Sequence, residues 1–172
     1  MAVGPTRRAV LAASAAAVPL LVSACRGVQV LGTPPGTAPD VRLLRSAIAA
    51  ERLMVARYRA AVAEASPAAH PAVATLTGIL AEHEQHLAQL NARLVVPEGS
   101  ASKSPPAAAA SGSLPAGLAN ALLALETAEQ DASDTLASQL LRVPPSLAQL
   151  MASISASEAT HVPVLRSLGR VR

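Results

Sequence analysis

The sequence predicts an all-α protein built as a four-helix bundle. Four stretches repeat apolar residues every three or four positions, and no stretch shows the alternation of a strand. The composition agrees, since 51% of the 172 residues are hydrophobic and only 1% are aromatic. The length suits one domain. A core of Ala, Leu, Val and Ile favours closely packed helices.

The first element, residues 1–24, has the pattern of a signal peptide. Arg7 and Arg8 precede an Ala-rich apolar run, and small residues lead to Cys25. The run is too short for a membrane-spanning helix. The paired arginines resemble a twin-arginine export signal, and Leu-Val-Ser-Ala-Cys at 21–25 resembles a bacterial lipobox.

This resemblance implies that Cys25 is lipidated and becomes the first residue of the mature protein. At about 0.8 kcal/mol per buried methylene, two or more acyl chains hold a protein stably on a bilayer. We therefore expect a protein anchored to the extracytoplasmic side of the cell membrane without spanning it. Residues 25–39 are rich in Gly and Pro, which predicts a flexible tether before the helical domain at 40–172.

The first predicted hairpin joins helices at 41–65 and 71–94. Asp40 is placed to cap the first helix, and Pro71 suits the first turn of the second. The short break at 66–70 requires the two helices to be antiparallel. The expected inward residues are Leu44, Ile48, Val55, Tyr58 and Val62 in the first helix, and Leu76, Leu80, Leu87, Leu90 and Leu94 in the second.

The second predicted hairpin joins helices at 115–141 and 147–168, separated by a break at Pro144 and Pro145. Residues 96–114 are of low complexity and are interpreted as a loop. Extended, such a loop reaches roughly 60 Å, whereas a helix of this size is about 33 Å long. Two antiparallel hairpins joined by a long crossover are therefore expected. Pro163 should kink the last helix or end it.

Titratable side chains interrupt the apolar face of every predicted helix. They are Glu51, His83, His86, Glu129, Glu158 and His161. Glu126, almost one turn before Glu129, is an alternative inward residue. Burying an unpaired carboxylate costs several kcal/mol, so these groups must either pair with one another or bind a cation. Glu and His at this spacing supply the oxygen and nitrogen ligands of a divalent metal ion.

The pattern resembles the ferritin-like superfamily of di-metal carboxylate bundles. Glu158-Ala-Thr-His161 matches its Glu-x-x-His element, while Glu51 and Glu129 match its single Glu positions. The stretches at 50–52 and 82–86 are also similar to a ferritin-like family of bacterial lipoproteins. On the second helix, however, His83-x-x-His86 replaces Glu-x-x-His, with Glu82 and Glu84 one residue out of phase.

The missing carboxylate weakens a di-iron oxidase interpretation. It favours a single ion, or a softer metal such as zinc or copper, over two iron ions. Iron, zinc, copper and manganese all stay candidates for one or two sites, because Glu and His ligands suit each of them.

Composition excludes several other function classes. The single Cys excludes an internal disulfide and Cys-x-x-Cys chemistry. Removing 1–24 leaves 12 basic against 11 acidic residues, so the high pI does not indicate a nucleic-acid partner. Tyr58 is the only aromatic residue, which removes base stacking, and it is interpreted as core packing. His70 is expected to face solvent.

Two functional hypotheses follow. In the first, the bundle binds metal and takes part in metal handling or in oxidative chemistry with oxygen or peroxide. In the second, the protein is a non-catalytic envelope lipoprotein whose metal-free bundle is a binding or structural module. Ala-rich helix surfaces would allow a homodimer. The sequence points to no particular protein partner and does not decide whether the protein is an enzyme.

Overall fold

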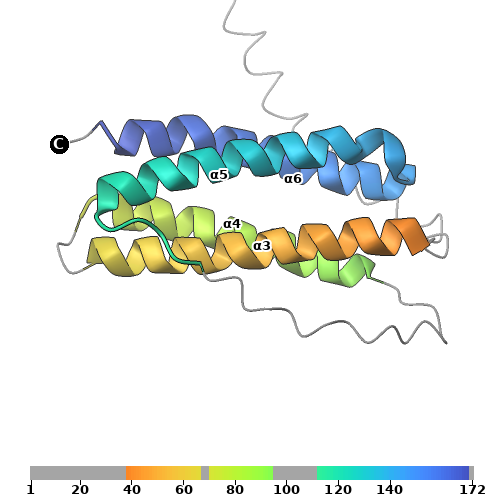
Figure 1. Cartoon of the computed structure of the whole chain (residues 1–172), viewed down its shortest axis with the longest axis horizontal. Coiled ribbons are helices and arrows are strands. Elements are labelled where there is room, and N and C mark those ends of the chain that lie inside the picture. Colours follow the sequence, from red (N-terminus) through yellow and green to blue (C-terminus); the bar gives the residue numbers. More distant parts are fainter. Residues whose placement is uncertain (1–37, 67–69, 95–111, 171–172) are drawn as a thin grey trace, which may run out of the picture. The chain divides into compact units, whose positions relative to one another are not determined.

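A computed structural model describes residues 38–66, 70–94 and 112–170, and within them it has four long helices (Figure 1). These are α3 (Ala38–Ala65), α4 (Ala72–Arg93), α5 (Leu118–Gln139) and α6 (Pro145–Leu168), with a short 3₁₀ helix, η3 (Leu140–Arg142), after α5. The all-α prediction is confirmed. The predicted signal, Cys25 and most of the tether lie outside the described residues.

The helices form two hairpins that pack side by side. α3 packs on α4 and α5 on α6, while α3 also contacts α5 and α4 contacts α6. α4 ends and α5 begins at opposite ends of the bundle (Figure 1), as a long crossover requires. Of the loop predicted at 96–114, residues 96–111 lie outside the described residues. Gly112 approaches α3 so closely that a Cβ atom there would lie 2.7 Å from the Cβ of Ala56.

The expected N-cap role of Asp40 is wrong, and one of the two effects expected of Pro163 is excluded. α3 begins at Ala38, so Asp40 is a buried residue of its first turn and not its N-cap. Pro39 explains the difference, because proline is well tolerated in a first helical turn. α6 continues through Pro163 to Leu168, so this proline does not end the helix.

The buried residues form two apolar clusters with a polar layer between them. The Leu76 cluster contains Met54, Tyr58, Ala61, Ala65, Ala72, Leu76, Ile79, Leu122, Leu125 and Leu165. The Met151 cluster contains Leu44, Ala47, Ile48, Leu90, Leu136, Leu147, Met151 and Ile154. Along every helix the polar layer, made of Glu51, His83, His86, Glu129, Glu158 and His161, lies between them.

Two inward positions of the first hairpin differ from the prediction by one residue. Ile79 is buried while Leu80 is half-buried, and Ala61 is buried while Val62 is half-buried. The Ser133 hydroxyl donates to the backbone carbonyl of Ser155, and the Ser155 hydroxyl donates to that of Ser133, both at 2.9 Å. This reciprocal pair ties α5 to α6 beside the polar layer.

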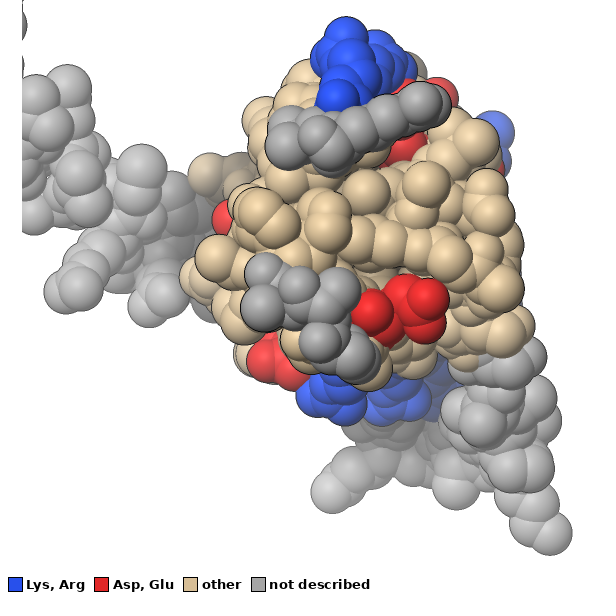
Figure 2. Space-filling model, turned by 90° about the vertical axis from the view of Figure 1, so that its left-hand side faces the viewer, with Lys and Arg blue, Asp and Glu red and all other residues tan. Residues whose placement is uncertain are grey.

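Figure 2 shows the end of the bundle at which α3 finishes and α4 begins. In the described part of this end, the basic side chains gather at two opposite edges, and most of the surface between them is uncharged. Among the described helices, none has the combined length and apolarity needed to cross a membrane.

Candidate metal centre

All six predicted site residues are buried, and they lie at the same level of the bundle. Their exposed fractions run from 0% for His83 and Glu129 to 9% for His86. On α4, the buried residues follow spacings of three and four from Ala72 through Leu76 and Ile79 to Leu90. His83 and His86 continue this spacing, so the periodicity that buries the leucines also buries both imidazoles.

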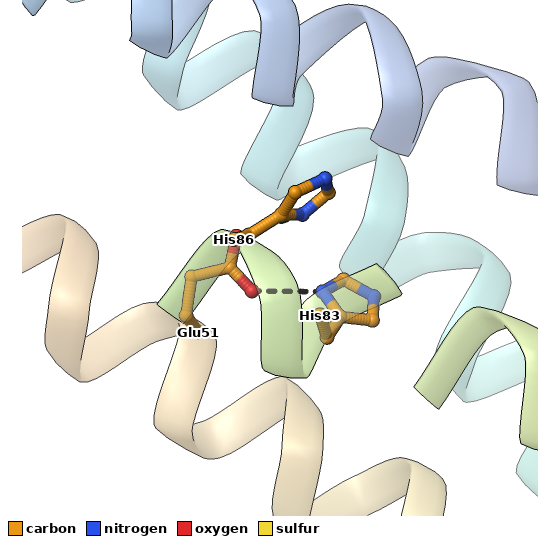
Figure 3. A group of neighbouring side chains, drawn as sticks. All are labelled: Glu51, His83 and His86. Atoms are coloured by element: carbon orange, nitrogen blue, oxygen red, sulfur yellow. Dashed lines mark hydrogen bonds and ion pairs between the residues drawn. The ribbon is translucent and has the colours of Figure 1, made fainter. Parts of the chain in front are cut away.

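A first triad joins α3 and α4 through Glu51, His83 and His86. Figure 3 shows the Glu51 carboxylate pointing from α3 toward both imidazoles of α4. Glu51 Oε2 lies 2.8 Å from His83 Nδ1, and Glu51 Oε1 lies 3.3 Å from His86 Nδ1. One potential ligand atom from each residue lies within 4.8 Å of the other two, a spacing that can hold a metal ion.

A second triad adds α5 and α6 through His83, Glu129 and His161. Glu129 Oε1 lies 2.9 Å from His83 Nε2 and 3.2 Å from His161 Nδ1. These ligand atoms also lie within 4.8 Å of one another. His83 therefore belongs to both triads and turns a different ring nitrogen toward each.

Opposite charges stabilise the ionised forms of these groups. Burial acts against the charged form of His83, but Glu129 and Glu51 outweigh it and raise the pKa of His83 to about 9. Burial likewise opposes ionisation of Glu129, yet His161, His83 and Tyr58 lower its pKa to about 2. The pKa of Glu51 is also lowered, because its interactions with His83 and His86 outweigh burial.

Glu158 behaves differently from the other two carboxyl groups. It is 2% exposed and belongs to neither triad. Burial first, and then the charges of Glu51 and Glu129, raise the pKa of Glu158 to about 8. Near neutral pH this side chain therefore holds a proton inside the polar layer.

Several donor and acceptor atoms of the layer are not satisfied within the described residues. Glu51 Oε1, His86 Nδ1, Glu129 Oε2 and His161 Nδ1 are buried and make no hydrogen bond. His86 Nδ1 and His161 Nδ1 each lie near a carboxylate oxygen, but neither pair is aligned as a hydrogen bond. A buried polar atom left unpaired costs about 1–3 kcal/mol. Converging ligand atoms without hydrogen-bond partners fit a metal ion.

Two residues outside the predicted set also contact the layer. The Tyr58 hydroxyl donates to Glu129 Oε1 at 2.5 Å, so Tyr58 is packed in the core and also bonded to the site. The half-exposed Glu82 places Oε2 3.0 Å from His161 Nε2. Tyr58 follows Glu51 by seven residues, a spacing that places both on one helix face. The spacing of α4 did not identify Glu82, because Glu82 directly precedes the inward residue His83 and its own position is exposed.

Two other sequence-based interpretations are settled by contacts. Glu126 pairs with Arg166 at 2.6 Å, and Glu129 is the buried residue, so Glu129 is the inward carboxylate of α5. His70 is half-buried, and its Nδ1 accepts a hydrogen bond from the backbone N–H of Ala72 at 3.1 Å. His70 thus contributes to the start of α4 and does not simply face solvent.

The chain matches no family model, no curated protein and no solved structure.

Proposed function

We propose that this protein is a membrane-anchored, extracytoplasmic protein of ferritin-like architecture that binds one or two divalent metal ions in its bundle core. One observation carries the proposal: two buried Glu/His triads share His83 and contain ligand atoms that have no hydrogen-bond partner among the described residues. A domain stabilised by only about 5–15 kcal/mol gains substantially when such atoms receive a ligand.

The donor set supports a metal that accepts imidazole. Three imidazoles and two ionised carboxylates contribute to the triads, which suits zinc, copper or iron better than ions that prefer only oxygen. A bound ion would supply Lewis-acid or redox chemistry. Around it, Tyr58 would hold the orientation of Glu129 and Glu82 that of His161, as partners of metal ligands commonly do.

The proposed location and role rest on the sequence and on the layer together. Arg7, Arg8 and the lipobox ending at Cys25 support export and lipid anchoring. A buried Glu/His centre on an anchored protein supports metal handling or oxidative chemistry at the cell envelope.

The second candidate is a metal-free envelope lipoprotein in which the polar layer is structural. It is favoured by the ion pairs of His83 with Glu51 and Glu129, which already neutralise much of the buried charge. A buried polar network makes a core specific without any ligand when all of its members are satisfied. The unsatisfied atoms of the two triads argue for the metal-binding function instead.

Metal analysis of protein produced through its native export route separates the two candidates. We expect stoichiometric metal in the wild type and its loss in the His83→Ala/His161→Ala double variant. His83→Gln/His161→Gln keeps polar side chains in the core but removes the imidazole ligands, so it should also lose the metal. Unchanged, sub-stoichiometric metal in all three proteins would support the structural role.

A further inference from the structure

A cavity of about 150 Å³ lies between α3 and α5 and leads to the polar layer. Exposed residues on the two helices, among them Ala50, Asp131 and Thr135, line its outer part. The buried Glu51 and Glu158 line its inner part. One water takes up about 30 Å³ in the liquid, so the cavity has room for a small ion with several waters.

Three of the lining residues carry buried oxygen atoms without hydrogen-bond partners. They are Glu51 Oε1, Glu158 Oε2 and Gln139 Oε1. Glu51 and Glu158 are both more than nine-tenths buried. With the Asp131 carboxylate and the Thr135 hydroxyl, the lining offers oxygen atoms of the kind that replace water around a divalent cation.

The opposite side of the layer, between α4 and α6, has a bonded carboxylate. There Glu82 Oε2 lies 3.0 Å from His161 Nε2 and also accepts a hydrogen bond from the Ser157 hydroxyl at 3.1 Å. His86 Nδ1 and His161 Nδ1 have no hydrogen-bond partner among the described residues, as is also true of Glu51 Oε1 and Glu158 Oε2. What distinguishes the α3–α5 side is the cavity, which Glu51 and Glu158 line.

We infer that the α3–α5 cavity is the access route by which a hydrated divalent cation reaches the polar layer. Asp131 attracts the cation at the outer part, Gln139 and Glu158 replace some of its waters, and Glu51 passes it to the imidazoles. This inference rests on the proposed metal-binding function and adds the path and the residues that control it.

The test compares the rate of zinc uptake by two metal-free variants of the exported protein. Ala50→Phe places a large side chain in the outer part of the cavity, whereas Ala60→Phe adds the same ring at an exposed position of α3 outside it. Zinc is mixed with each protein in the presence of a chromophoric chelator. We expect uptake about tenfold slower in Ala50→Phe than in Ala60→Phe, with equal final stoichiometry.

A second arm tests the role of charge. Asp131→Asn should slow uptake about twofold to threefold at low salt, and the difference from wild type should shrink as salt screens the carboxylate.

Equal uptake rates for Ala50→Phe and Ala60→Phe would overturn the access route while leaving the metal site in place. Slower uptake in Ser157→Phe alone would move the route to the α4–α6 side. Absence of uptake by the wild type, with zinc and then with copper or iron in its place, would remove the proposed function and the route together.

Discussion

Leu76 and His83 lie seven residues apart on the same face of α4, and both have an exposed fraction of 0%. Leu76 is surrounded by apolar side chains of the Leu76 cluster, which need only close packing. His83 is surrounded by two carboxylates and two other imidazoles, which need charge balance and alignment.

The difference shows how stability and chemistry are divided within one bundle. The apolar clusters toward its two ends stabilise the fold by removing hydrocarbon from water. The polar layer between them is only partly satisfied and keeps its charges in a region of low dielectric constant. The charge balance of the layer therefore depends on its protons, and a metal ion could take their place, whereas the clusters depend on neither.

Removing His83 should have the largest effect on the layer. In metal-free protein, His83→Ala leaves the carboxylates of Glu51 and Glu129 without their shared cation, which should lower the free energy of unfolding by about 3–5 kcal/mol. The same variant removes a ligand from both triads and should abolish metal binding. Chemical denaturation and metal analysis measure the two effects. Retention of full metal content would contradict the central position of His83.

Removing Leu76 should destabilise the protein without touching the layer. Leu76→Ala opens a cavity in the apolar cluster and should lower the free energy of unfolding by about 2–5 kcal/mol. Because the ligands stay in place, metal content per folded chain should equal that of the wild type. Loss of metal in this variant would mean that the cluster and the layer are not independent. Leu76→Ala could then not serve as a control that separates loss of stability from loss of metal in His83→Ala.

The stability of the metal-free protein should fall as the pH rises above neutrality. The pKa of His83 is raised from 6.5 to about 9 in the folded protein, so its contribution is present below pH 6.5 and is lost as the pH rises through 9. This loss amounts to about 3 kcal/mol. The pKa of Glu158 is raised from 4.5 to about 8 in the folded protein, so its contribution to stability is likewise lost as the pH rises from 4.5 to 8.

Denaturation curves at several pH values check this prediction, with Glu158→Gln as the control. The control should show a shallower decline below pH 8, because it no longer has a buried acid to ionise. Metal affinity should change in the opposite sense and rise with pH, since an ion competes with protons for the same imidazoles. A metal-free wild type of constant stability from pH 6.5 to 9 would contradict the raised pKa of His83.

The smallest expected effect is at Tyr58, which belongs to the apolar cluster and also bonds to the layer. Tyr58→Phe keeps the ring and removes the donor to the ionised Glu129, which should lower the free energy of unfolding by about 1.5 kcal/mol. In a Glu129→Gln background, Tyr58→Phe should lower the free energy of unfolding by a smaller amount. Equal losses in both backgrounds would show that the Tyr58 hydroxyl does not act through Glu129.

The sequence was sufficient to predict the helical bundle and the inward position of the six residues of the layer. Leu44, Ile48, Val55 and Tyr58 recur on one face of a long helix, and Glu51 occupies the missing step between Ile48 and Val55. This spacing requires burial of the carboxylate whatever the neighbouring helices are. The burial of Glu51 could therefore be predicted from the sequence of this one helix.

Other features depend on tertiary contacts that spacing does not encode. Small buried residues such as Ala61, Ser133 and Ser155 carry little periodic hydrophobic signal, yet they set how closely the helices approach. Glu82 reaches His161 although its position on α4 is exposed, because its side chain is long and α6 lies beside it. The choice between Glu126 and Glu129 required the position of Arg166.

The cavity lies where the two hairpins meet, since α3 and α5 belong to different hairpins. The reciprocal serine bonds hold α5 to α6, so they connect helices within one hairpin and do not cross the cavity. A small tilt of one hairpin relative to the other would widen the passage to Glu51 while every serine bond stayed intact. On the proposed route, exchange of ions with the surroundings would therefore require a movement between the two hairpins and not the unfolding of either helical pair.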